Sequence, residues 1–320
     1  MFIYRELPEK DGWFSGLWYS DQAPAPTRPP GFIMPFEDPI QRILFITPSQ
    51  TLKRLFAYLR NHGGALSGSQ AVKRALYLRG KSREFYVEIG QMLFGQNTRI
   101  FERLDEDTYR LTPLEEFNVP LEKATFAVLD IETTGGKPPF ERVTEVAVLR
   151  LDGRGQELSR YSTLVNPKKK IPPYVVRHTG ISDEMVKAAP TIDKVIPEIL
   201  NFLDGSILVV HDSFADMQFL DYDSDRLFEG LISLPLLNTQ HLAERFCPEI
   251  GGLGLSRVAG HVGVEIGERH RALADAELTG RVLTYFLGKM NGQTIYDVYL
   301  DTADESSYIR PGPMGNNNDH

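Results

Sequence analysis

Two different spacings of apolar residues divide the chain into a small N-terminal part and a larger C-terminal part. In the stretches 48–61, 68–80 and 82–95, apolar side chains recur every three or four positions, which is the helical period. Gly63 and Gly64 after the first stretch and Gly80 at the end of the second favour helix ends there. Two short alternating stretches around the acidic turn 105–107 then predict a β-hairpin. Residues 41–113 are therefore expected to form a module of three helices and a hairpin.

The second part, residues 123–290, alternates between strand-like and helical patterns. Short apolar runs typical of buried strands occur at 126–132, 143–153, 157–167 and 206–211. Longer stretches with helical spacing occur at 191–203 and 271–290. This order predicts an α/β domain with a mixed sheet, and residues 114–122 are expected to link it to the helical module.

The two ends of the chain differ from these parts. Residues 1–40 are rich in proline and contain both tryptophans, Trp13 and Trp18. Because aromatic residues are unusual in a purely disordered tail, we expect this arm to pack against a domain or a protein partner. Residues 291–320 are polar, and we expect a poorly ordered C-terminal tail.

Composition narrows the setting of the protein. The chain has 320 residues, of which 42% are hydrophobic, but no run of eighteen apolar residues, so no membrane span is expected. Cys247 is the only cysteine, which excludes a disulfide within the chain. With an N-terminus that does not have the pattern of a signal peptide, these features favour a cytoplasmic location.

Charge is distributed unevenly along the sequence. The net charge is −8, yet residues 41–112 hold 12 Lys/Arg and 6 Asp/Glu. A basic module is thus joined to a remainder with excess negative charge. Acidic residues that gather to hold cations would give the remainder such an excess.

Acidic residues with apolar neighbours are the first candidates for chemistry. Asp130 and Glu132 point to the same face of a predicted strand, where two like charges repel each other unless a cation lies between them. Asp216 falls in the first turn of a helix that follows a buried strand, and Asp275 lies inside the last long helix, shortly after His270. Taken singly, each acid could equally be solvated, cap a helix or form an ion pair.

Taken together, these residues have a recognisable order. D-x-E on a first strand, H-x4-D after an inner strand and H-x4-D at a late helix, with the segments DIETTG, VNP, HTGIS, VVHDSFADMQFL and HRALADA, resemble the DEDDh family of 3′→5′ exonucleases. The resemblance covers residues 125–287. It implies an α/β, ribonuclease H-like fold, in which a mixed sheet is flanked by helices.

The resemblance also implies roles for single residues. Asp130, Glu132, Asp216 and Asp275 would hold two divalent cations, Mg²⁺ or Mn²⁺, which prefer oxygen ligands. His270 would act as the general base. Thr133, Thr134 and Gly135 would approach the terminal nucleotide, and His178 would bind substrate.

Three positions depart from the family pattern. Asp212 stands where Asn is usual, and Ala215 stands where a Phe usually precedes the aspartate, with the ring displaced to Phe214. Asn238 replaces the usual Asp before Thr239. These departures affect the expected contacts with sugar and base, and hence the subgroup, but they remove neither a metal ligand nor the base.

The basic module adds a second expectation. Three helices followed by a hairpin resemble a winged-helix domain, here a small α+β unit. Arg74, Arg79, Lys81 and Arg83 crowd the joint between its second and third helices, and Lys53, Arg54 and Arg60 lie on the polar side of the first. The four residues at the joint, with Arg99, Arg103 and Arg110 on the predicted hairpin, could bind the phosphates of a duplex. The alternative is a solvated basic face used for dimerisation or protein docking.

The sequence therefore favours a metal-dependent 3′→5′ exonuclease that acts on single-stranded DNA or 3′ overhangs. Two alternatives stay open at this point. The metal site does not decide between DNA and RNA, so an exoribonuclease fits as well. The protein could also be an end-binding scaffold, or a subunit of a repair, replication or defence complex.

Overall fold

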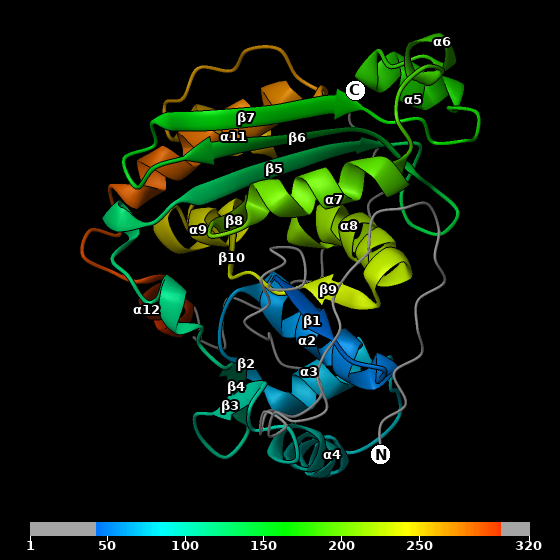
Figure 1. Cartoon of the computed structure of the whole chain (residues 1–320). Helices are drawn as coiled ribbons and strands as arrows, with labels where there is room; N and C mark the ends of the chain where they lie inside the picture. The colour runs from blue at the N-terminus through cyan, green and yellow to red at the C-terminus, as the bar shows by residue number, and fades with distance from the viewer. Residues whose placement is uncertain (1–42, 302–320) are drawn as a thin grey trace, which may run out of the picture.

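The computed structural model describes residues 43–301, which form two packed domains (Figure 1). The arm of residues 1–40, with Trp13 and Trp18, lies outside the described residues. Within residues 43–301, no helix combines the length and the apolar character needed to cross a membrane.

A five-stranded mixed sheet forms the centre of the larger domain. Its strands, in the order β10-β8-β5-β6-β7, are Leu236–Asn238, Ile207–Val210, Phe126–Thr133, Val143–Leu151 and Glu157–Leu164. β5, β6 and β7 form an antiparallel meander, while β8 and β10 run parallel to β5. The predicted α/β class and mixed sheet are confirmed.

Helices cover both faces of this sheet. α7 (Ile192–Leu203) and α8 (Ser213–Phe228) lie on one side, and α11 (Ala272–Leu287) lies behind the sheet in Figure 1. Gly280 allows α11 to approach β6 closely, since a Cβ there would lie 3.1 Å from the Leu151 side chain. The remaining helices of this domain are α5 (Pro173–Thr179), α6 (Asp183–Val186), α9 (Thr239–Phe246) and α10 (Leu255–His261).

The smaller domain contains the predicted three helices and hairpin. The helices are α2 (Gln50–His62), α3 (Gly68–Ala75) and α4 (Arg83–Gly95), and a sheet of order β2-β4-β3 combines Leu66–Ser67, Thr108–Leu111 and Phe101–Arg103. Its core includes Phe94 and Tyr109, whose rings stack at 4.4 Å. Assignment of this domain to the winged-helix class stays a prediction.

Strand pairing and buried charges join the two domains. β1 (Leu44–Ile46) pairs with β9 (Gly230–Ile232) in an antiparallel ladder. The Arg60 side chain is 2% exposed, and its guanidinium donates two hydrogen bonds to the Asp221 carboxylate, at 3.0 and 2.6 Å. Lys53 likewise pairs with Asp225. The expectation that Lys53 and Arg60 lie on a polar side of the first helix is wrong, because both are buried against α8.

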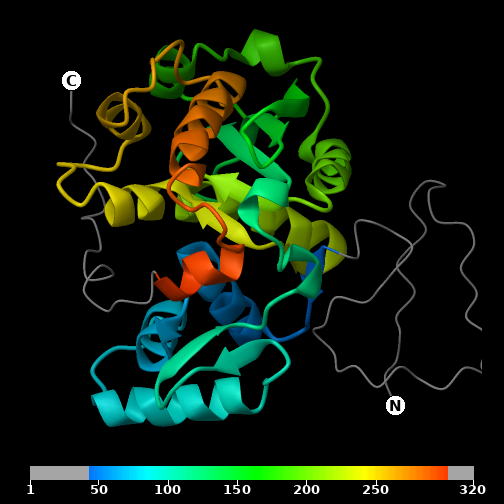
Figure 2. The ribbon, with the colours of Figure 1, turned by 90° about the vertical axis from the view of Figure 1, so that its left-hand side faces the viewer.

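The C-terminal segment also differs from the prediction. Residues 291–301 do not form a loose tail, because α12 (Ile295–Asp301, red in Figure 2) packs at the domain junction. The Tyr299 hydroxyl accepts a hydrogen bond from the Leu236 backbone N–H at 2.7 Å, and the Tyr296 hydroxyl accepts one from Leu114 at 2.7 Å. The polar sequence around this short apolar stretch concealed its helical face. Residues 302–320 lie outside the described residues.

Candidate metal and nucleolytic site

Three of the predicted acids meet at one edge of the sheet. Asp130 and Glu132 lie on the same face near the carboxyl end of β5, and Asp275 lies in the first turn of α11. One oxygen from each carboxylate lies within 4.8 Å of the others. Residues 130 and 275 are far apart in sequence, so packing of α11 against β5 brings these oxygens together.

Asp216 faces the same cluster from α8, although its oxygens lie outside the group of three. Its side chain is buried, and its pKa is raised well above the ordinary value by burial and by the charges of Asp212, Glu132 and Asp275. The pKa of Asp130 is raised in the same direction, by burial first and then by Asp216 and Asp275. The four acids therefore repel one another across a common space.

Neighbouring arginines compensate for this charge only in part. The Arg269 guanidinium donates to the Asp275 carboxylate at 2.5 Å, and Arg271 pairs with Glu145 at 2.7 Å. Even so, the pKa of Glu132 is raised to about 7, by burial first and then by the charges of Asp275 and Glu145. An all-carboxylate donor set with unbalanced negative charge fits hard divalent cations such as Mg²⁺ or Mn²⁺.

Glu145 is a residue of this site that sequence reasoning missed. It lies on β6 directly opposite Glu132 and is 3% exposed. Its carboxylate accepts a hydrogen bond from the Ala272 backbone N–H at 2.9 Å, so it binds the N-terminus of α11. By fixing where α11 begins, Glu145 positions Asp275. An acid in the middle of the apolar run 143–149 was the available signal.

His270 lies directly beside the acids. It adopts a left-handed backbone conformation, with φ 63°, and its backbone N–H donates to the Asp275 carboxylate at 3.2 Å. The imidazole of His178, from the last turn of α5, lies 3.8 Å from the His270 ring, centroid to centroid. Burial, His178 and Arg269 together lower the pKa of His270 and favour its neutral form. The structure thus brings both predicted histidines to one place.

The turn after β5 is held by hydrogen bonds of its own residues. Thr134 is fully buried, and its hydroxyl donates to the Glu141 carboxylate while accepting from the Arg142 N–H. The approach of this turn to a terminal nucleotide stays a prediction, and in this structure Thr134 stabilises the turn itself. Thr133 is half-buried and donates to the Gly135 carbonyl at 2.7 Å. A Cβ on Gly135 would lie 2.9 Å from the Glu141 side chain, which explains the glycine.

The predicted basic residues lie on the other domain. Arg74, Arg79, Lys81 and Arg83 are all exposed, around the α3–α4 connection. Their side chains are accessible to a ligand, although none lies among the carboxylates.

The departures from the family pattern have local uses. The Asp212 carboxylate caps α8 by accepting from the backbone N–H groups of Phe214 and Ala215, at 3.2 Å each. The Asn238 amide donates to the Ser213 hydroxyl at 2.9 Å, which in turn donates to the Asn61 carbonyl of α2 at 2.7 Å. An aspartate at 238 would compete for the hydroxyl proton of Ser213, so Asn238 suits the contact between domains.

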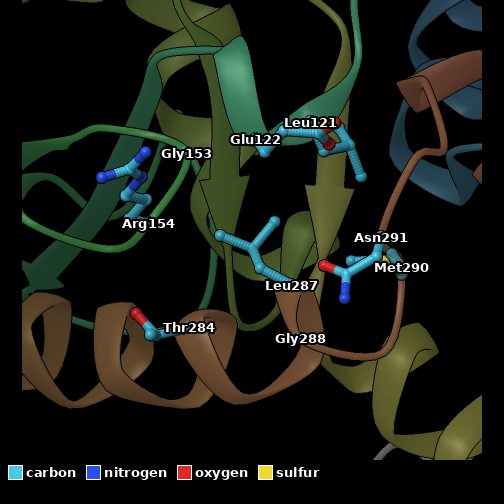
Figure 3. A pocket seen from close by; sticks show the side chains of 9 residues that line it. All are labelled: Leu121, Glu122, Gly153, Arg154, Thr284, Leu287, Gly288, Met290 and Asn291. Atoms are coloured by element: carbon cyan, nitrogen blue, oxygen red, sulfur yellow. The ribbon is translucent and has the colours of Figure 1, made fainter.

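A pocket elsewhere in the domain is not lined by the predicted metal-binding acids. It lies between the C-terminal end of α11 and the β6–β7 turn, and its lining includes Thr284, Leu287, Gly153 and Arg154 (Figure 3). With a rise of 1.5 Å per helical residue, Thr284 is roughly 14 Å along α11 from Asp275. The carboxylate site is therefore distinct from this pocket.

Comparisons with known proteins match the larger domain. Residues 127–283, just under half of the chain, match the family model described as exonuclease, RNase_T. DNA polymerase III PolC-type of Clostridium perfringens is 33% identical over 186 residues, which are 56% of this chain and 13% of that protein. PolC-type polymerase III of Oceanobacillus iheyensis is 33% identical over 159 residues, 50% of this chain and 11% of that protein.

Solved structures give a weaker likeness. Exonuclease X in complex with 5′ overhanging duplex DNA is 23% identical, with a TM-score of 0.45, and the match covers 55% of this chain and 98% of that one. This chain spans only a small part of the length of the two polymerases.

Proposed function

We propose that this protein is a metal-dependent 3′→5′ exonuclease that removes nucleotides from single-stranded DNA or 3′ overhangs. The observation that carries the proposal is the convergence of Asp130, Glu132 and Asp275 oxygens within 4.8 Å of one another in an exonuclease family domain. A scaffold that only binds ends would not require four mutually repelling acids beside a neutral histidine.

Each residue has a role in this proposal. Asp130, Glu132, Asp216 and Asp275 would hold the divalent cations, whose chemistry is to polarise the scissile phosphate and make water more acidic. His270 accepts the proton of the attacking water, since its lowered pKa keeps the ring neutral near pH 7. The His178 ring packs against the His270 ring, with the centroids 3.8 Å apart, and orients this general base. Arg269 and the His270 backbone N–H hold the Asp275 carboxylate.

Digestion of 5′-labelled oligonucleotides with Mg²⁺, Mn²⁺ or a chelator tests the activity. The wild-type protein should shorten the labelled oligonucleotide from its 3′ end with either metal and leave it at full length with chelator. Asp130→Asn should reduce the rate by at least about 10³-fold, because it removes a charge that the cations need. Asp183→Asn, on exposed α6, is the matched control. Equal hydrolysis by wild type and Asp130→Asn would exclude the mechanism.

The same assay distinguishes DNA from RNA. Exoribonuclease activity is the second candidate, because cations held by the acids would act on the phosphate in DNA and RNA alike. Parallel digestion of DNA and RNA of one sequence measures the preference directly.

The basic face around the α3–α4 connection is the proposed anchor for a neighbouring duplex. Arg79 and Lys81 are exposed, so their replacement by alanine should weaken duplex binding and reduce its salt dependence. Unchanged affinity and salt slope would leave this face as a solvated or protein-docking surface.

A further inference from the structure

Aromatic rings from both domains meet beside the first turn of α8. The Tyr58 and His62 rings, one turn apart on α2, lie 4.1 Å from each other, centroid to centroid. The Phe214 ring lies 4.9 Å from His62, edge to face, and 6.3 Å from Tyr58. Phe214 is 43% exposed, which is unusual for a phenylalanine that belongs to an aromatic cluster.

This cluster adjoins the acid site. Phe214 precedes Asp216 by two residues, a separation of about 3 Å along the helix axis. The carboxylate of Asp212, which caps the same turn, is the neighbouring charge with the largest effect on the pKa of Asp216. The two side chains are roughly 200° apart around the helix axis, so the exposed Phe214 ring and the buried Asp216 carboxylate lie on different faces of the same turn of α8.

Cations continue the surface away from the acids. Arg74 is exposed on α3, which packs against α2, and its charge acts on both Tyr58 and His62. One turn before Tyr58, the Arg54 guanidinium lies 5.9 Å from the centroid of the Tyr77 ring. Tyr77 is 79% exposed. The exposed rings of Phe214 and Tyr77 thus lie at the two ends of a strip, with the half-buried rings of Tyr58 and His62 and the two exposed arginines between them.

The rings in this strip are uncharged. Burial lowers the pKa of His62 to about 4, so its imidazole is neutral near pH 7. Negative ligands would therefore interact with the arginines, and flat apolar ligands with the exposed faces of the rings. Rings and cations on one surface match the bases and phosphates of an unpaired strand.

We propose that the strip formed by Arg54, Tyr58, His62, Arg74, Tyr77 and Phe214 binds the single strand immediately behind its 3′ end. Bases stack on the exposed rings, and phosphates contact the two arginines. A paired base hides its faces within the duplex, so the strip selects unpaired nucleotides. This inference rests on the proposed exonuclease function and assigns part of the substrate path to the N-terminal domain.

Fluorescence anisotropy with the full chain tests the strip. The probes are a labelled oligothymidylate of roughly twelve nucleotides and a blunt duplex of the same length, with Ca²⁺ present to occupy the carboxylates. Tyr58→Ala and Phe214→Ala should each weaken single-strand binding about five-fold or more, as loss of one stacked base would. Arg74→Ala should reduce the slope of log K against log salt by about 0.7.

Two further variants serve as controls. Tyr58→Phe keeps the ring and should bind like wild type. Tyr285, on α11, is an exposed tyrosine with the Lys289 ammonium 5.4 Å from its ring, so Tyr285→Ala matches the chemistry of the strip at a distant place. It should leave affinity unchanged. Circular dichroism of each variant establishes that it is folded.

The proposal would be overturned if folded Tyr58→Ala and Phe214→Ala bound the single strand within two-fold of wild type. It would also be overturned if Tyr285→Ala lost as much single-strand affinity as these variants, or if these variants lost as much affinity for the blunt duplex as for the single strand. Failure of the proposed exonuclease function would give a different result from failure of the strip. The wild-type protein would then bind the single strand through these rings but would not hydrolyse it.

Discussion

Arg269 and Arg271 flank His270 and bind different acids, Asp275 and Glu145. The order of the motifs along the sequence, through its resemblance to the DEDDh pattern, predicted Asp130, Glu132, Asp216, Asp275 and His270. The arginine partners and Glu145 could not be assigned in this way, because their contacts depend on how α11 packs on β6. Local pattern identifies candidate ligands, whereas long-range packing decides which charges balance them.

Protonation of the acids gives a prediction at this scale. Without divalent ions, the pKa values of Asp130, Glu132 and Asp216 in the folded protein are raised above those of the unfolded chain. Their contribution to the free energy of unfolding is therefore complete below about pH 4 and is lost as the pH rises, through about 7 for Glu132.

Thermal unfolding in chelator should thus show a melting temperature that falls between about pH 5 and pH 8. Added Mn²⁺ should raise it most at the upper end, where the acids are charged. Glu132→Gln removes one titrating group and should make the profile flatter. A metal-free melting temperature that rises steadily to pH 8 would mean that the arginines already balance the acids.

At the scale of elements, α2 is held against α8 by buried charge. Arg60 and Asp221 are both buried and share two hydrogen bonds. Arg60→Ala should lower the free energy of unfolding by about 3–5 kcal/mol, because it leaves the Asp221 carboxylate buried without its partner. The double variant Arg60→Met, Asp221→Leu should recover most of this loss. Urea unfolding measures both, and a loss below about 1 kcal/mol for Arg60→Ala would contradict the account.

The helices and strands also differ in how well the sequence predicts them. Long periodic stretches such as α2, α7 and α11 were predicted, because their own spacing defines an apolar face. β1 and β9 have three residues each, and they exist through pairing with each other across 180 or more positions. α12 was missed for a related reason, since its tyrosines are buried through contacts with distant residues, among them Leu114 and Leu236.

At the scale of the whole molecule, the two domains should unfold together. Removal of residues 1–113 would delete the partner of β9, the Arg60 side chain and the Asn61 carbonyl that binds Ser213. We expect the 114–320 fragment to melt at least about 10 °C below the full chain, or to aggregate through the exposed β9 edge. The full chain should show one calorimetric transition, and two separate transitions would contradict this coupling.

The smaller domain is attached at both of its ends. β1 enters it from a ladder with the larger domain, and the segment that leaves it is tied to α12 through Leu114 and Tyr296. A unit anchored in this way cannot swing like a tethered arm. Under the proposed function, a strand bound to its surface would therefore reach the carboxylates after a constant number of nucleotides, and digestion should stop at a uniform remnant length.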